Sequence, residues 1–148
     1  METFIANPAF NTYALCAAIL ALKMIASAVY TGAQRQRSQG YANPEDARTF
    51  GQAGAAAQAL DPPAVAHALR IQRNDLENIP TFFAIGLLYV LTGASAFGAA
   101  VYCWTFTIAR LAHTVAYMNN LQPWRAIAFG VGALAVIGMA VQIIVRAL

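Results

Sequence analysis

The sequence predicts an all-α integral membrane protein built as a bundle of four transmembrane helices. Of its 148 residues, 59% are hydrophobic and only 10% are charged, whereas soluble domains carry about 25% charged residues. The mean hydropathy is +0.54. Four apolar runs are separated by polar or turn-forming stretches, and each is long enough to cross the hydrocarbon core, which needs about 20 residues. The formal charge of +3 is too small and too dispersed to indicate nucleic-acid binding.

The first predicted span covers residues 8–30 and contains one cation, Lys23. A lysine well inside a span is expected to face a partner helix or a water-filled cavity. Alternatively, its stem lies along the helix and its amine reaches the headgroups. The residues alone leave both positions open for Lys23.

Residues 31–63 form the only sizeable polar region, with turn signals at Asn43-Pro44 and Asp61-Pro62-Pro63. The Ala/Gln/Gly stretch 51–60 is expected to be a loop, with room for at most one weak helical turn. Because there is no second domain to connect, this region is not a domain linker. The prediction is a single membrane domain over residues 1–148.

The remaining spans are predicted at residues 64–91, 96–118 and 124–146. Pro62-Pro63 allows the first of these helices to begin. Pro80 lies inside it, removes a backbone donor and is expected to bend it. Trp124 and Arg125 open the last span with residues typical of a membrane interface.

Residues 70–77 hold four ionisable side chains and an amide within eight residues. On a helix, three of them share one face with the amide of Asn74, because Arg70, Arg73, Asn74 and Glu77 are spaced i, i+3, i+4 and i+7. This face offers two guanidinium forks, an amide and a carboxylate. A ligand that carries carboxylates and an ammonium would find a partner there for each charge.

A second polar row follows in the third span, with the same spacing: Arg110, His113, Thr114 and Tyr117. Asp75 lies off the shared face of residues 70–77, so we expect it to pair with Arg110 across helices. His113 is equally well explained as a buried core histidine or as a functional one.

The competing interpretation of the first row is an internal Arg70–Glu77 pair. We favour ligand binding for Arg73, Asn74 and Glu77, because an unpaired guanidinium near lipid costs several kcal/mol. The sequence therefore indicates an anionic ligand at this face.

Basic residues set the expected orientation. The first and third connections carry arginines, whereas the second carries none. The positive-inside rule then places the first and third connections in the cytoplasm and both termini on the opposite side. The charged face, Arg35 and Arg125 would all lie at the cytoplasmic surface.

Other chemistries find no support in the residue pattern. His67 and His113 have no clustered cysteine or carboxylate partners, so we predict no metal site. Cys16 and Cys103 lie in apolar runs and are expected to be buried fillers without a disulfide. No protein nucleophile is indicated, so the reactive group would arrive with the ligand. Arginines around a thiol would favour its thiolate.

Three blocks of sequence carry a family resemblance over nearly the whole chain. They are Asn43-Pro44-Glu45-Asp46, Arg70-x-x-Arg73-Asn74-Asp75-Leu76-Glu77-Asn78 and Arg110-x-x-His113-Thr114-Val115-Ala116-Tyr117. In this order they resemble the MAPEG superfamily, the membrane-associated proteins in eicosanoid and glutathione metabolism. Within it, the sequence is most similar to the subgroup of microsomal glutathione transferase type 1 and microsomal prostaglandin E synthase.

The resemblance implies a homotrimer of four-helix protomers with glutathione bound between adjacent protomers, near the cytoplasmic side. It implies a catalytic arginine at Arg125, which would stabilise the thiolate, and a loop aspartate of the isomerase mechanism at Asp46. The implied glutathione-binding residues are Arg35, Arg70, Arg73, Asn74, Glu77, His113, Tyr117 and Arg125.

Two departures bear on the reaction. The synthase has a serine directly after the matched arginine and a tyrosine three positions later, where this chain has Ala126 and Phe129. The segment Gln122-Pro123-Trp124-Arg125-Ala126 instead resembles the transferase. These differences argue against prostaglandin isomerisation.

The resemblance therefore implies a membrane-bound glutathione transferase for detoxification. Its second substrate would be a lipophilic electrophile or, for a peroxidase activity, a lipid hydroperoxide dissolved in membrane lipid. The alternatives are a glutathione-dependent isomerase of the prostaglandin E synthase type and a non-catalytic lipid-binding scaffold. A further alternative is a small transporter that uses Lys23 and Arg110 as pathway residues.

Overall fold

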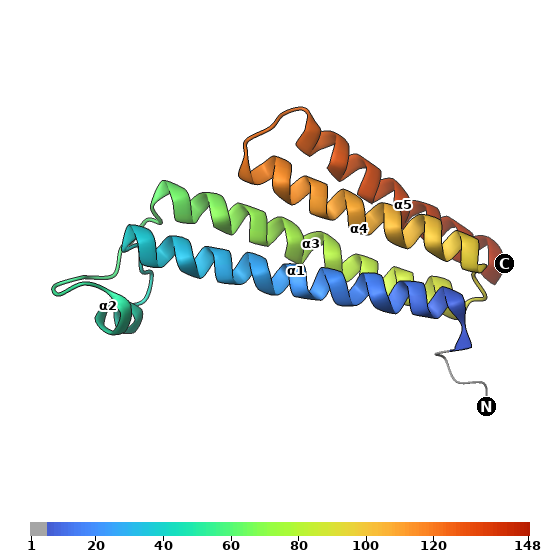
Figure 1. Cartoon of the computed structure of the whole chain (residues 1–148), viewed down its shortest axis with the longest axis horizontal. Helices are drawn as coiled ribbons and strands as arrows, with labels where there is room; N and C mark the ends of the chain where they lie inside the picture. Colours follow the sequence, from blue (N-terminus) through green and yellow to red (C-terminus); the bar gives the residue numbers. More distant parts are fainter. Residues whose placement is uncertain (1–5) are drawn as a thin grey trace. The chain divides into compact units, whose positions relative to one another are not determined.

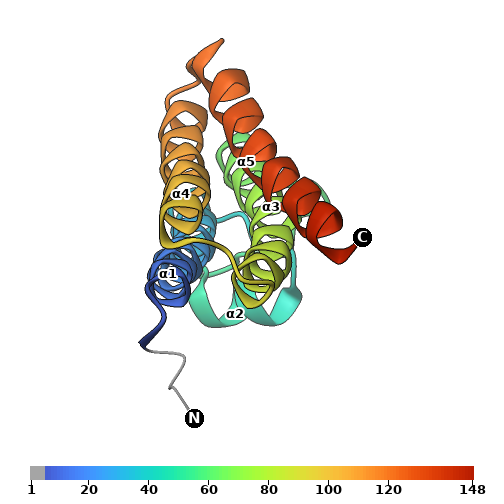
Figure 2. The same cartoon turned by 90° about the vertical axis from the view of Figure 1, so that its right-hand side faces the viewer.

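The computed structural model describes residues 6–148 and contains five α-helices (Figures 1 and 2). In chain order they are α1 (Pro8–Ser38), α2 (Pro44–Phe50), α3 (Pro63–Leu91), α4 (Ala96–Met118) and α5 (Trp124–Ala147). No strand occurs within this range. The all-α prediction is confirmed; the first five residues of the predicted domain lie outside the described residues.

The helix α1 is longer than predicted, since it ends at Ser38 and not near residue 30. The added residues include Gln34, Arg35 and Arg37, which are good helix formers. Arg35 and Arg37 occupy the last turn, where positive side chains interact favourably with the helix dipole. The chain leaves the helix only at Gln39, which has a φ of 52°.

Residues 51–60 form a loop, as predicted, but without the helical turn that was considered there. The short helix α2 lies before them. Pro44 starts α2 with its fixed φ, and Glu45 and Asp46 complement the dipole in the first turn. The alanines of residues 51–60 favour helix, but the glycines among them and the short length of the run work against one.

The helices α3, α4 and α5 begin and end within one residue of the predicted ranges. Pro80 lies inside α3. Gly93, with a φ of 82°, supplies the left-handed conformation needed in the α3–α4 turn. Ser95 then caps α4, because its side chain accepts a hydrogen bond from Gly98 N at 3.0 Å.

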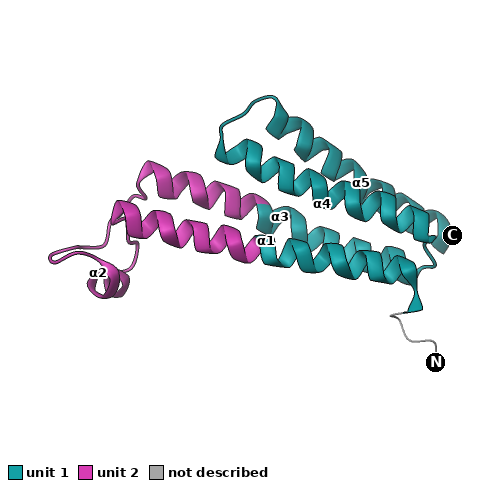
Figure 3. Ribbon diagram, viewed as in Figure 1, with its two compact units in different colours: residues 1–23, 75–148 teal, residues 24–74 magenta. Residues whose placement is uncertain are grey.

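Two compact units divide the chain (Figure 3). One comprises residues 1–23 and 75–148 and contains α4 and α5 with parts of α1 and α3. The other comprises residues 24–74 and contains α2 with the remaining parts of α1 and α3. In the first unit α4 packs along α5.

Aromatic rings fill the interior of the first unit. Phe82 of α3 stacks on Phe106 of α4 with 4.5 Å between ring centroids. The Tyr13 hydroxyl on α1 donates to the carbonyl of Phe83 at 2.8 Å. Cys16 and Cys103 are free and buried, as predicted. These contacts fix the helix faces that carry the polar side chains described below.

Two helices are long and apolar enough to cross a membrane, namely α1 and α5. The two helices that carry the polar rows, α3 and α4, are not among them. Many large apolar side chains on α1 and α5 are exposed, including Leu22, Val29, Leu134 and Ile137. An exposed apolar surface of this kind suits a lipid environment.

Candidate functional site

A buried ionic cluster lies in the unit formed by residues 1–23 and 75–148. Asp75 Oδ1 accepts from Lys23 Nζ at 2.5 Å and from Arg110 Nη2 at 3.2 Å. Asp75 and Arg110 are each 1% exposed, and Lys23 is 8% exposed. One carboxylate oxygen therefore binds two cations in the interior, contributed by α1 and α4.

The ionic cluster answers two questions that the sequence left open, namely the partner of Asp75 and the direction of the Lys23 side chain. The predicted Asp75–Arg110 pair is confirmed, and Lys23 faces a partner helix instead of extending to a headgroup. The Lys23–Asp75 pair itself was not predicted. A signal for it exists, because a lysine in an apolar run and an aspartate off the charged face both require partners.

His113 lies one helical turn after Arg110 and is 3% exposed. Its ring centroid is 5.7 Å from that of Tyr117, in an edge-on arrangement, and 6.4 Å from that of Phe129. The imidazole therefore packs against rings from both α4 and α5. Burial agrees with a core histidine, and the contact with Tyr117 places it beside a predicted ligand-binding side chain.

Arg125 lies in the first turn of α5, and its guanidinium carbon is 4.4 Å from the centroid of the Tyr117 ring. With the Gln122 amide oxygen turned toward it, Arg125 donates to that oxygen from Nη2 at 2.7 Å and from Nε at 3.1 Å. Within residues 6–148, no carboxylate forms an ion pair with this guanidinium.

Two sources of positive potential coincide at Arg125. Arg125 is half-buried, and it lies at the N-terminus of a 24-residue helix, where the helix dipole is also positive. The helix does not stabilise a cation there, so the two fields together favour a negatively charged group. The arrangement can hold an anion beside the guanidinium that lies over the Tyr117 ring.

The row along α3 is exposed on the side opposite the buried Asp75. Arg70, Arg73 and Glu77 are exposed, and Asn74 is half-buried. In the described part of the chain, none of the three charged residues takes part in an ion pair. The Arg70–Glu77 pair considered from the sequence is therefore not formed. The charged members of the row are exposed on the single chain.

Arg35 belongs to a separate cluster in the unit of residues 24–74. Its Nη1 donates to Asp61 Oδ1 at 2.9 Å and to the carbonyl of Gly40 at 3.1 Å. Arg35 also lines a cavity of about 390 Å³, together with Tyr41 and Asp46. Asp46 also accepts from the Asn43 amide at 3.1 Å.

The predicted site residues therefore occur in three groups. His113, Tyr117 and Arg125 lie together, Arg35 and Asp46 line one cavity, and the remaining four lie along α3. The partners Asp61 and Gln122 were not predicted as site residues. In the sequence, Asp61 is recognisable only as the first residue of a predicted Asp-Pro-Pro turn. Within the described residues, no cluster of three His, Cys, Asp or Glu side chains is suited to a metal ion.

Comparison with known proteins identifies the family of the chain. The model of the MAPEG family matches residues 13–145. The prostaglandin E synthase of Homo sapiens is 36% identical over 139 residues, which cover 93% of this chain and 90% of the relative. The microsomal glutathione S-transferase 1 of Rattus norvegicus is 38% identical over 138 residues, covering 92% and 87% of the two chains. With a match over almost its whole length and relatives at this identity, the chain belongs to the MAPEG family.

Proposed function

We propose that this protein is a membrane-bound glutathione transferase that stabilises the thiolate of glutathione for attack on lipophilic electrophiles. The observation that carries the proposal is Arg125, a half-buried cation at a helix N-terminus without a carboxylate partner in the described chain. The proteins that are similar to this chain include a microsomal glutathione S-transferase. An anionic sulfur is the group that this positive field would stabilise.

Glutathione carries a charged or polar group that could bind each of the predicted glutathione-binding residues. Arg35, Arg70 and Arg73 bind its two carboxylates, and Glu77 binds its ammonium. Asn74, His113 and Tyr117 provide further polar contacts, and Arg125 binds the sulfur. Both exposed arginines of α3 lack an ion-pair partner in the described chain, so they can bind a carboxylate without first releasing an internal one.

In the reaction, the thiol proton leaves to water and the thiolate attacks the electrophilic carbon. With a halonitrobenzene, a carbon–sulfur bond forms and the halide leaves with its bonding electrons. With a lipid hydroperoxide, two molecules of glutathione are oxidised to the disulfide while the hydroperoxide is reduced to an alcohol and water. Arginine acts in both cases by lowering the energy of the sulfur anion.

The test of this proposal uses purified protein in detergent at neutral pH. Adding glutathione should produce a saturable ultraviolet absorbance of the thiolate, and a halonitrobenzene should be conjugated. The analogue with serine in place of cysteine is the control, since it should bind without a thiolate signal. Binding of glutathione with neither thiolate nor conjugation would instead support the non-catalytic scaffold.

The assembly is also a proposal. We infer four transmembrane helices, a single domain over residues 1–148 and a homotrimer, with the glutathione site facing the cytoplasm and both termini on the opposite side. The two candidate spans and the family membership indicate a membrane protein. The arginine-rich first connection supports the orientation.

A glutathione-dependent isomerase remains the second candidate, because the relatives include prostaglandin E synthases. Asp46 and Arg35 line the same cavity, which is the observation that favours it. The apolar side chains of Ala126 and Phe129 argue against it, and Phe129 packs against His113 without a hydroxyl. Product analysis after addition of a prostaglandin endoperoxide separates the two activities.

The pair between Arg35 and Asp61 leads to a prediction about affinity. If Arg35 binds a carboxylate of glutathione, Asp61 competes for the same guanidinium at 2.9 Å. Asp61→Asn should therefore tighten glutathione binding, by up to about fivefold, because an exposed ion pair is worth up to about 1 kcal/mol. Titration calorimetry measures the change.

The matched control is Asp61→Glu, which keeps the negative charge and should leave the affinity close to that of the wild type. Weaker binding in Asp61→Asn would contradict the prediction. It would mean that Asp61 orients Arg35 for the ligand instead of competing with it.

A further inference from the structure

The guanidinium of Arg125 is held by an uncharged group. Its Nη2 and Nε atoms donate to the side-chain oxygen of Gln122 at 2.7 and 3.1 Å. A guanidinium carries five N–H donors and no acceptor, so the amide of Gln122 turns its oxygen toward it. Among residues 6–148, no carboxylate forms an ion pair with Arg125. The charge of this arginine is therefore fixed in place without being neutralised.

Local structure brings the two side chains together. Gln122 lies in the turn between α4 and α5 and precedes Arg125 by three positions, a spacing that puts two side chains on the same side of a helical turn. The backbone here already has a helical hydrogen bond, because Arg125 N donates to the carbonyl of Leu121 at 3.1 Å. Gln122 is exposed, so a substitution there does not disturb the interior.

Two contacts restrain the guanidinium in different directions. Its central carbon lies 4.4 Å from the centroid of the Tyr117 ring, which restrains one face of the planar group. Contact with a ring face alone leaves the plane free to turn about its own centre. The two hydrogen bonds to Gln122 remove that freedom, because they fix one edge of the plane. Tyr117 and Gln122 together therefore set the direction in which the remaining N–H groups point.

The hydrogen bonds to Gln122 also decide which edge of Arg125 is left for a ligand. Nε and Nη2 form the side edge of the guanidinium, whereas Nη1 and the second N–H of Nη2 form the end edge. Gln122 occupies the side edge. An anion that accepts from two nitrogen atoms of Arg125 must therefore meet the end edge.

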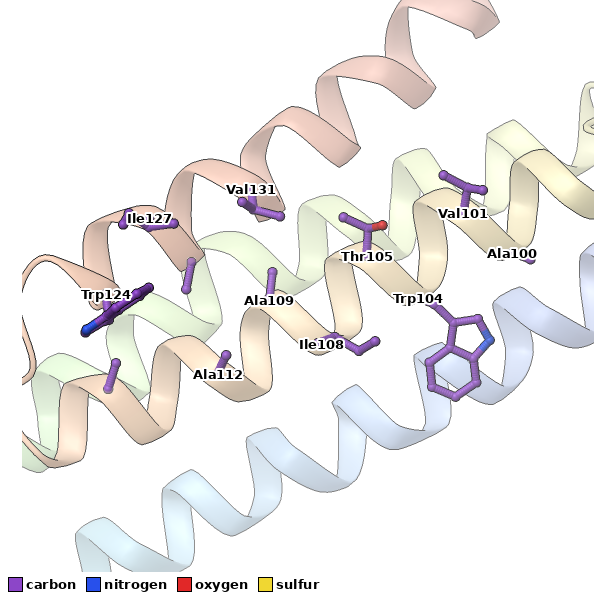
Figure 4. A pocket seen from close by; sticks show the side chains of 12 residues that line it. Ala100, Val101, Trp104, Thr105, Ile108, Ala109, Ala112, Trp124, Ile127 and Val131 are labelled. Atoms are coloured by element: carbon purple, nitrogen blue, oxygen red, sulfur yellow. The ribbon is translucent and has the colours of Figure 1, made fainter.

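The other groups near Arg125 add no negative charge. On α4 they are Tyr117 and His113, which interacts electrostatically with Arg125 and lies edge-on to the Tyr117 ring. Trp124 lines a pocket of about 580 Å³ between α4 and α5, and no acidic or basic side chain takes part in its lining (Figure 4). Neither α4 nor α5 contains an aspartate or a glutamate.

We propose that Gln122 is a positioning residue for the reaction: its neutral oxygen holds the side edge of Arg125, so that the end edge keeps its full charge for the sulfur of glutathione. This inference rests on the proposed function and deepens it, because it assigns the geometry of the sulfur site. A carboxylate in the same place would form the same hydrogen bonds and would also cancel the charge that the sulfur requires. The neutrality of Gln122, and not its hydrogen bonds alone, is therefore what the reaction needs.

Gln122→Glu keeps the shape and both hydrogen bonds but adds a negative charge beside the sulfur. The ultraviolet absorbance of the thiolate, titrated with pH at saturating glutathione, should have its midpoint about 1–2 pH units higher than in the wild type, because a nearby negative charge raises the pKa of a thiol. Below the wild-type midpoint, the conjugation rate should fall about tenfold for each unit.

Gln122→Leu is the companion variant, since it keeps the size of the side chain but offers no acceptor. It should lower kcat by about tenfold, because the guanidinium is no longer directed. The midpoint of its thiolate titration should move by less than that of Gln122→Glu, because the charge of Arg125 is retained. A wild-type kcat in Gln122→Leu would overturn the positioning role, and a wild-type midpoint in Gln122→Glu would overturn the requirement for a neutral oxygen.

The matched control is Gln52→Glu, which adds the same charge at an exposed position of the loop after α2. It should titrate and turn over like the wild type. The unfolding temperatures of both Gln122 variants should also equal that of the wild type, because the side chain is exposed. A fall in unfolding temperature that accompanies the loss of rate in both would show that Gln122 acts on folding and would overturn the proposal.

A measurement without glutathione separates this proposal from the proposed function. The Nε–H of Arg125, labelled with nitrogen-15 and assigned by its loss in Arg125→Lys, should exchange with water slowly in the wild type and quickly in Gln122→Leu. This pattern without any thiolate in the wild type would remove the transferase, and the sulfur site with it, and leave the contact. A normal thiolate with equal exchange in the two proteins would remove the role of Gln122 and leave the transferase.

Discussion

Asp75→Asn is expected to lower the thermal stability of the protein in detergent by on the order of 10 °C, corresponding to a loss of about 3–5 kcal/mol. The wild-type carboxylate neutralises two buried cations, Lys23 and Arg110. Asparagine has almost the same shape but leaves both positive charges in the interior without a negative one. Thermal unfolding followed by circular dichroism measures the difference.

Two further variants give stability losses with which that of Asp75→Asn can be compared. Lys23→Met removes one cation and keeps the Asp75–Arg110 pair at 3.2 Å, so it should cost clearly less than Asp75→Asn. Asp61→Asn breaks a more exposed pair and should cost at most about 1 kcal/mol. An unfolding temperature for Asp75→Asn close to that of the wild type would show that the ionic cluster contributes little to folding.

Arg125→Ala is expected to reduce glutathione conjugation at neutral pH by about 10²–10³-fold, the usual effect of removing one preorganised charge-stabilising group. Its guanidinium is the group that we propose to hold the sulfur anion. Removing the positive charge raises the pKa of the bound thiol toward the value of a free thiol, about 8.5. Steady-state rates measured as a function of pH show the change.

The sign of the pH effect follows from this shift. Thiolate is the reactive form, so the wild-type rate should level off at a lower pH than that of Arg125→Ala, and the two should converge as the pH rises. Arg125→Lys keeps the charge but loses the planar fork over Tyr117, and should fall between them. Arg37→Ala, at an exposed position of α1, is the control. An unchanged pH profile in Arg125→Ala would remove this arginine from the mechanism.

Local signals were sufficient to predict much of the fold. The bounds of α3, α4 and α5 follow from apolar runs that end at strong breakers, such as Gly93 and Pro123. The predicted end of α1 near residue 30 was too early, because the polar residues after it were assumed to lie outside the helix. Gln34 and Arg35 are polar and still good helix formers, so the helix continues to the first residue with a positive φ.

The site was predictable to the extent that its residues lie on one helix. The row of α3 follows from the 3.6-residue period alone. Contacts across the fold depend on tertiary packing and leave no such trace: Lys23 meets Asp75 across 52 positions, and Arg35 meets Asp61 across 26.

The shared carboxylate of Asp75 has a consequence for how the protein reaches its membrane. If α1, α3 and α4 cross the bilayer as proposed, each enters it with an ionic group that is costly on its own in hydrocarbon. The cost falls only when Lys23, Asp75 and Arg110 meet. Insertion of these three segments should therefore be coupled, with α1 held near the translocation machinery until α3 and α4 have been synthesised.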